Sequence, residues 1–75
     1  MGLKDISIRI SGLITEAKLT SDRTAEELAA DIGYTDRTIR EKARARELYT
    51  LPFDKIWMIA GLAGYEVVFI KKSDI

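Results

Sequence analysis

Cysteine and histidine are both absent from this chain of 75 residues. Without cysteine the protein has no disulfide and no thiol nucleophile, and without histidine it has no imidazole to bind zinc or act as a general base. Any metal site would consist of oxygen ligands alone. The sequence also lacks a glycine-rich phosphate loop and a nucleophile motif. We therefore expect a protein that is not an enzyme and that has no metal, cofactor or small-molecule ligand.

Long apolar runs are also missing, since none approaches the roughly 18 residues of a membrane helix. The first residues show no charged-then-apolar signal pattern, and a chain without cysteine suits the cytosol. The sequence predicts a cytoplasmic protein with no membrane partner. Residues 1–75 form a single predicted domain, and a domain of this size buries only about 60% of its unfolded surface. A second subunit would enlarge that small core.

The net charge is zero, from 12 basic and 12 acidic residues, but the charges are unevenly distributed. Residues 36–46 hold five basic and two acidic side chains, a net of +3, whereas residues 1–35 have a net of −2 and residues 47–75 a net of −1. A local basic stripe is typical of nucleic-acid-binding modules. A solvated helix face with mixed charges would have the same composition, so charge alone leaves both interpretations open.

The spacing of apolar residues predicts four helices, at about residues 5–18, 24–32, 35–45 and 53–63. Capping signals mark the middle two. Thr24 followed by Glu27 is a capping box, and Thr35 is a favourable N-cap residue. Gly33 suits the end of the second helix. The fourth helix is expected to contribute three large side chains to the core, Phe53, Ile56 and Trp57.

Residues 66–71 are rich in β-branched and aromatic side chains and predict a short C-terminal strand. A single strand is not stable alone. It would have to pair with residues 6–10 of the same chain or with its own copy in a second chain. Residues 6–10 alternate between apolar and polar as a strand does. They also fit the apolar stripe of the first predicted helix, and of the two interpretations we favour the helix.

Two short helices separated by Gly33-Tyr34-Thr35 form the pattern of a helix-turn-helix. The first helix needs a small residue where the second approaches it, and Ala29 is the candidate. The second helix needs an apolar side chain that faces inward, and Ile39 meets this requirement. The second helix also carries most of the basic stripe, which would leave a basic surface available to a partner.

The motif Thr24-Ala25-Glu26-Glu27-Leu28-Ala29, followed by Ile32-Gly33 and Thr35-x-x-Thr38-Ile39, resembles the helix-turn-helix of the XRE or Cro/C1 family, which includes phage Cro and repressor proteins. The later stretch Ile59-Ala60-x-x-Ala63-Gly64 is similar to the end of that family's last core helix. Together these motifs cover about residues 6–64. The resemblance implies a mostly α fold, a compact four-helix helix-turn-helix domain, here followed by the predicted strand.

The sequence departs from the family pattern at two places. Ala25 stands where the family often has a glutamine that touches phosphate. Lys42, Ala43 and Ala45 stand where the family commonly has an apolar residue, a glutamate and a glycine turn. Contacts with the DNA backbone and the end of the recognition helix are therefore expected to differ from those of the family.

The resemblance implies that residues 35–45 lie in the major groove of double-stranded DNA, with the first residues at base edges. The candidate DNA-binding residues are Thr24, Thr35, Asp36, Arg37, Thr38, Arg40, Glu41 and Arg44. Arg37 is the best candidate for specificity, because a guanidinium matches the O6/N7 edge of guanine. The cations expected to meet phosphates are Arg40, Lys42, Arg44 and Arg46. Two roles stay open: Asp36 as a base contact or a helix-end stabiliser, and Glu41 as an acceptor from cytosine or a partner of Arg37.

These features together predict a small transcriptional regulator of the repressor type that binds double-stranded DNA as a homodimer. A two-fold dimer would occupy half-sites about 34 Å apart. Family analogy also suggests an origin in a phage or a mobile element. Two alternatives remain. One is a protein-interaction module, such as an antitoxin or anti-repressor, with Tyr49, Leu51 and Phe53 as an exposed patch. The other is a winged helix in which residues 66–72 pair with residues 6–10.

Overall fold

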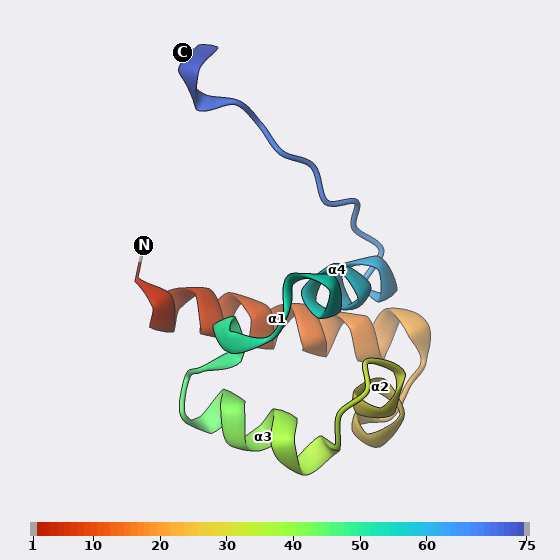
Figure 1. Ribbon diagram of the computed structural model, residues 1–75. Helices are drawn as coiled ribbons and strands as arrows, with labels where there is room; N and C mark the ends of the chain where they lie inside the picture. The colour runs from red at the N-terminus through yellow and green to blue at the C-terminus, as the bar shows by residue number, and fades with distance from the viewer. Residues whose placement is uncertain (1, 75) are drawn as a thin grey trace.

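The computed structural model describes residues 2–74. This part of the chain contains four α-helices and two short 3-10 helices, joined by loops (Figure 1). The elements are α1 (Leu3–Ser21), α2 (Ala25–Asp31), α3 (Asp36–Arg44), η1 (Leu48–Thr50), α4 (Phe53–Leu62) and η2 (Lys72–Asp74). The expected compact, mostly helical domain with four helices is confirmed. Its principal extents are 42 × 25 × 18 Å, and the longest includes a C-terminal segment that leaves the helical body.

The long helix α1 organises the domain. Its buried side chains are three or four residues apart and so lie on one face: Ser7, Ile10, Ile14 and Ala17. α4 and η1 pack against α1, and α2 and α3, which pack against each other, lie below α1 in Figure 1. Because residues 6–10 belong to α1, the competing strand at this position is excluded.

The end of α1 was predicted too early, at residue 18. The helix continues to Ser21 and stops at Asp22, which adopts a left-handed conformation with φ of 54°. The N–H groups of Asp22 and Arg23 both donate to the carbonyl of Lys18. Left-handed residues commonly end helices, but the residue is usually glycine. An aspartate in this role carries a weaker sequence signal.

The core lies between α1 and the other helices. Its buried members are Ile10, Ile14, Ala17, Leu28, Ala29, Ile32, Ile39, Leu48, Leu51, Ile59 and Ala63. The prediction that Phe53 and Trp57 belong to this core is wrong, since they are 51% and 46% exposed, and Ile56 is half-buried. The apolar arc of α4 is wider than the face that α1 covers, so α4 buries Ile59 and Ala60 instead.

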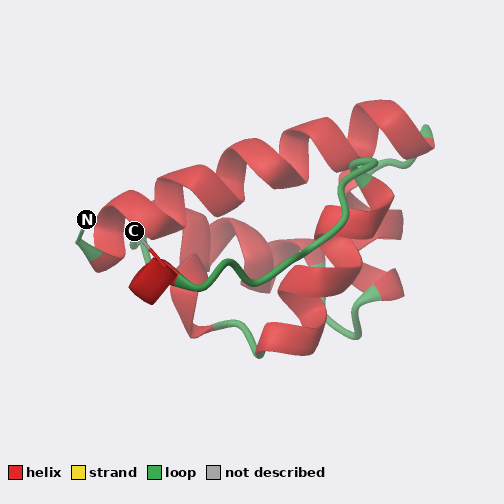
Figure 2. Ribbon diagram, turned by 90° about the horizontal axis from the view of Figure 1, so that it is seen from above, coloured by secondary structure: helices red, strands yellow, loops and turns green. Residues whose placement is uncertain are grey.

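The predicted strand at residues 66–71 is not present, and no strand occurs among residues 2–74. The segment is an extended loop, drawn in green in Figure 2. Within the described chain, none of the backbone hydrogen bonds outside the helices involves residues 66–70. A strand requires a second backbone to complete its ladder, and residues 6–10 are helical. The winged-helix alternative, which needs that pairing, is therefore wrong.

Candidate nucleic-acid interface

The turn between α2 and α3 is built from local hydrogen bonds. Gly33 has a φ of +82°, which glycine adopts without strain. The N–H of Gly33 donates to the carbonyl of Ala30, and the N–H of Tyr34 donates to the carbonyl of Ala29. This pair of bonds is a Schellman motif. Ala29 is buried, as expected for the small residue at the crossing of the two helices.

Threonine N-caps start both helices of the motif. The Thr24 Oγ1 accepts from the N–H of Glu27, and the Glu27 carboxylate accepts in return from the N–H of Thr24 at 3.0 Å. Hydrogen bonding by Thr24 holds the pKa of Glu27 below its ordinary value of 4.5. The Thr35 Oγ1 accepts from the N–H of Thr38 and lies 3.0 Å from the Thr38 hydroxyl. Both predicted caps are confirmed.

α3 presents two opposite faces. Ile39 is its buried residue and points to the core. At 100° per residue, Arg37, Glu41 and Arg44 share a stripe on the opposite side, and all three are exposed. Thr38 is half-buried at one flank of that stripe, and Arg40 is exposed at the other. The arrangement leaves a row of charged side chains accessible on an otherwise weakly buried helix.

Two ion pairs run along α3. Arg37 Nε lies 2.9 Å from Glu41 Oε1, and Arg40 Nε lies 3.0 Å from Asp36 Oδ2. The Arg37 side chain remains 85% exposed, so this pair contributes only about 0.3–0.5 kcal/mol. Asp36 is different, because its side chain is only 15% exposed. The structure therefore places the Glu41 carboxylate beside Arg37, and it places Asp36 inward beside Arg40.

The C-terminal end of α3 carries the remaining cations. Lys42 Nζ donates to the Thr50 hydroxyl at 2.8 Å, which ties α3 to η1. Arg46 takes the left-handed position with φ of 57°, and its N–H and that of Glu47 donate to the carbonyls of Ala43 and Lys42. Within residues 2–74, no salt bridge involves Arg44 or Arg46. Both cations are exposed.

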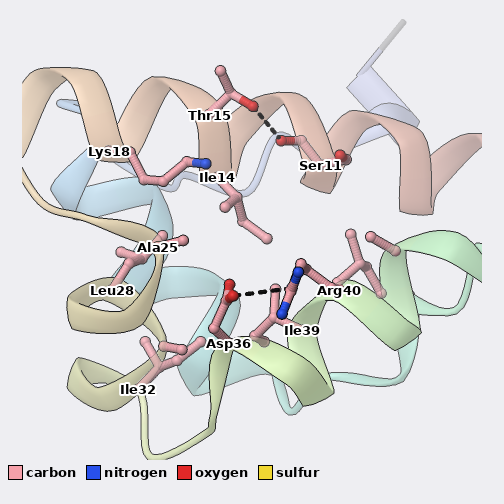
Figure 3. A pocket seen from close by; sticks show the side chains of 13 residues that line it. Ser11, Ile14, Thr15, Lys18, Ala25, Leu28, Ile32, Asp36, Ile39 and Arg40 are labelled. Carbon is pink, nitrogen blue, oxygen red and sulfur yellow. Dashed lines mark hydrogen bonds and ion pairs between the residues drawn. The ribbon is translucent and has the colours of Figure 1, made fainter.

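A cavity of about 160 Å³ lies between α1 and the pair formed by α2 and α3 (Figure 3). Its base is apolar, with Ile14, Leu28 and Ile39 among the lining residues. Asp36 and Arg40 face one another on the α3 side of the cavity, and Lys18 lies across from them on α1 (Figure 3). α3 therefore has few neighbours on its α1 side.

A buried hydrogen bond between Ser7 and Leu48 could not be predicted from the sequence. Ser7 is buried in the apolar face of α1, and its hydroxyl accepts from the N–H of Leu48 at 2.9 Å. The bond ties η1 to α1. Because Thr50 of η1 is bonded to Lys42, the position of η1 also affects the end of α3. A serine within an apolar stripe is the only sequence signal for this contact.

The predicted protein-binding patch of Tyr49, Leu51 and Phe53 does not form as a surface. Leu51 is 4% exposed and belongs to the core. Exposed apolar side chains gather instead on α4 and in the segment after it: Phe53, Trp57, Met58, Tyr65, Val68, Phe69 and Ile70. Hydrogen bonding with Glu16 of α1 raises the pKa of the Tyr65 phenol above its ordinary value.

In the part of the chain that the structure describes, no three acidic side chains come together in a way that could hold a metal ion. No helix of residues 2–74 has the length and apolar character needed to cross a membrane. Comparison with family models, with curated proteins and with solved structures finds no match.

Proposed function

We propose that the protein binds double-stranded DNA in a sequence-specific manner and acts as a small transcriptional regulator of the Cro/repressor type. α3 is the proposed recognition helix, placed in the major groove. Occupation of an operator by such a domain would control transcription by steric exclusion. The proposal assigns base contacts to the start of α3 and phosphate contacts to its cations.

One observation carries the proposal: the face of α3 opposite Ile39 is a row of exposed charged side chains. Two short capped helices joined by a tight turn present this row to solvent. This arrangement supports the helix-turn-helix interpretation, in which the second helix projects side chains outward. The +3 charge of residues 36–46 supplies attraction to phosphates that the rest of the chain lacks.

Arg37 is the proposed specificity residue. Its Nε is engaged by Glu41 in the free protein, and its terminal nitrogens remain available for the O6 and N7 atoms of guanine. The Glu41 carboxylate would orient the guanidinium. Thr24 and Thr35 are the N-cap residues just before α2 and α3, where hydroxyl and backbone N–H groups suit phosphate oxygens. Asp36 and Arg40 are a pair, and Arg40 would have to exchange part of that pairing for a phosphate.

The first experiment is fluorescence anisotropy with a pool of random duplex DNA at low and physiological salt. Binding that weakens steeply with salt is expected, because cations displace counterions from phosphates. Selection from the pool would then yield the preferred site. No binding at low salt would contradict the proposal and favour a protein partner.

Two substitutions separate the assigned roles. Arg37→Ala is expected to relax the base preference at one position and to weaken binding to the selected site by about 1–3 kcal/mol. Arg44→Ala is expected to weaken binding to all sequences alike and to reduce the salt slope by about 0.9. Arg9→Ala on the exposed surface of α1 is the matched control. Unchanged DNA affinity in both α3 variants would show that α3 is not the recognition helix.

A further inference from the structure

The cavity between α1 and the pair formed by α2 and α3 is large enough for one organic ring. Its volume is about 160 Å³, and apolar cavities of about 150 Å³ are known to bind benzene. All three helices contribute buried apolar side chains to its base, with Ile14 on α1, Leu28 on α2 and Ile39 on α3. Water would find no hydrogen-bond partner among these side chains, so the base suits an apolar group.

Three charged side chains also line the cavity, and their sum is positive. Lys18 belongs to α1, and the Asp36–Arg40 pair lies across from it on α3 (Figure 3). The other polar lining residues are neutral. They are Ser11 and Thr15, and the Thr15 hydroxyl donates to the Ser11 carbonyl at 3.2 Å. Two cations and one carboxylate leave a net charge of +1, which matches a ligand with a single negative charge.

Both cations keep hydrogen-bond donors for such a ligand. Lys18 is half-buried, yet none of the salt bridges within residues 2–74 involves it. The Nε of Arg40 lies 3.0 Å from Asp36 Oδ2. A guanidinium has more N–H donors than one carboxylate can accept from, so Arg40 can serve Asp36 and a second anion together.

We propose that this cavity binds a small monocarboxylate that carries one ring, an anion of the size of benzoate. The ring occupies the apolar base, and the carboxylate accepts from Lys18 and Arg40. Ligand sites commonly combine an apolar lining with a few polar groups that fix the orientation. Because the lining comes from separate helices, no contiguous motif marks the site, and for this reason the sequence led us to expect no small-molecule ligand. The proposal does not rest on DNA binding.

The test is a titration of the isotope-labelled full chain with benzoate at neutral pH, without DNA, followed by NMR. Saturable shifts are expected at the methyl groups of Ile14, Leu28 and Ile39, with a dissociation constant of about 1 mM or lower. Val68 and Ile70 are exposed apolar residues outside the cavity, and their methyl signals should stay in place. Shifts of equal size at Val68 and Ile70, or no saturable shift in the cavity, would overturn the proposal.

Two matched compounds separate the contributions of the ring and the charge. Benzamide keeps the ring but has no charge, so it should bind roughly tenfold more weakly than benzoate. Acetate keeps the charge but has no ring, and it should cause no saturable shift of the cavity methyl groups. Equal affinities for benzoate and benzamide would show that the charged side chains do not recognise the ligand.

Substitutions of the charged lining residues should change the benzoate affinity in opposite directions. Lys18→Met keeps the length of the side chain but removes its charge, so the affinity should fall roughly tenfold, and Lys18→Arg should restore most of it. Asp36→Asn removes the carboxylate that competes for Arg40, so the affinity should rise several-fold. Benzamide should bind all these variants alike. Lys4→Met, at an exposed position of α1 outside the cavity, is the control. Changes of the same sign in Lys18→Met and Asp36→Asn, or no change in either, would refute the site.

Filling the cavity tests where the ring lies. Ala43 is half-buried and lines the cavity, so Ala43→Leu should abolish the binding of both benzoate and benzamide. Ala30→Leu, at an exposed position of α2 outside the cavity, should bind as the wild type does. Circular dichroism checks that both variants keep their helices, and the charge variants decide the matter if Ala43→Leu does not fold. Normal binding by a folded Ala43→Leu variant would show that the ring lies elsewhere.

Discussion

α1 and α3 are held in the domain in different ways. α1 buries four side chains along its length and packs against α4 and η1. α3 buries one, Ile39, and borders a cavity on the side that faces α1. The helix proposed to bind DNA is thus attached by Ile39 and by its packing against α2, and its C-terminal end is tied to η1 by the Lys42–Thr50 bond.

This contrast shows how a small domain can keep a charged face available. A helix that buried more residues would gain stability, but it would have fewer positions for outward cations. α3 keeps its position through the buried Ile39, its packing against α2 and the Lys42–Thr50 bond. The contrast predicts that changes in α1 act on the whole domain, whereas changes in α3 act on one contact at a time.

The largest effects are expected from truncating the buried side chain of each helix. Ile10→Ala should lower the free energy of unfolding in the upper part of the usual range of about 2–5 kcal/mol. Ile39→Ala should fall in its lower part, because the cavity beside Ile39 already deprives it of neighbours. Urea denaturation measures both values, and hydrogen exchange should show faster opening of α3 in Ile39→Ala. A larger loss for Ile39→Ala than for Ile10→Ala would invert the comparison.

The second prediction concerns the buried hydroxyl of α1. Ser7→Ala should cost about 1–3 kcal/mol, because the N–H of Leu48 would stay buried without an acceptor. Ser11→Ala, one turn later on an exposed position, is the control and should be neutral or slightly stabilising, since alanine favours helix. If thermal or urea unfolding gives the same value for both variants, the Ser7 bond does not hold η1.

The N-caps of α2 and α3 provide a matched comparison. Thr35→Ala and Thr24→Ala should each cost about 1 kcal/mol. Thr35→Ala should weaken DNA binding more than Thr24→Ala does, since α3 would fray where the base contacts are proposed, whereas Thr24 is assigned to phosphate alone. Anisotropy with the selected site, beside urea unfolding of both variants, measures this. Equal losses of DNA affinity in the two variants would indicate that the start of α3 has no special role.

Acid titration sharpens the same comparison, because only the Thr24 cap has a carboxylate partner. The pKa of Glu27 is lower in the folded state, so its contribution to stability is present above about its ordinary value of 4.5 and is lost as pH falls through the lowered pKa. Glu27→Gln should therefore flatten the acid limb of the stability curve. Circular dichroism as a function of pH measures the acid limb. If the limb is the same in Glu27→Gln and the wild type, Glu27 does not contribute to stability.

The smallest effect is expected at Arg46. Because Arg46 is left-handed, Arg46→Gly should relieve backbone strain and raise stability by about 0.5–1 kcal/mol. The same change removes a proposed phosphate contact, so DNA affinity should fall while stability rises. Gly64→Ala, at a left-handed glycine far from α3, should lower stability instead. Opposite signs at the two positions would confirm that backbone conformation is responsible.

The parts of the fold that depend on neighbouring residues could be predicted from the sequence. The caps at Thr24 and Thr35, the turn at Gly33 and the inward position of Ile39 all follow from local patterns. The later end of α1 could not be predicted, because Asp22 takes the left-handed position. A glycine at this position would have indicated a helix end. Residues 66–71 have the composition of a strand, but a strand forms only when a second backbone is present.

Side-chain burial was harder to predict than helix position. Phe53 and Trp57 lie in an apolar arc that is wider than the surface of α1, and the sequence does not say which part of the arc is covered. Ser7 can be buried because its hydroxyl accepts from the N–H of Leu48, which is distant in the sequence. This pairing is visible only in three dimensions. For the proposed site, the row of cations follows from the sequence, whereas the pairing of Arg37 with Glu41 and of Arg40 with Asp36 is visible only in three dimensions.

The packing of α1 against α4 has a consequence for how the protein is made. The first and last helices of the domain must meet before the core can close. Synthesis proceeds at about 5–20 residues per second, so this stretch of 75 residues emerges over roughly 4–15 s. Helical domains with short connections fold within about milliseconds once their contacts are available. α2 and α3 can thus assemble early, while the nascent chain stays without a closed core until α4 has left the ribosome.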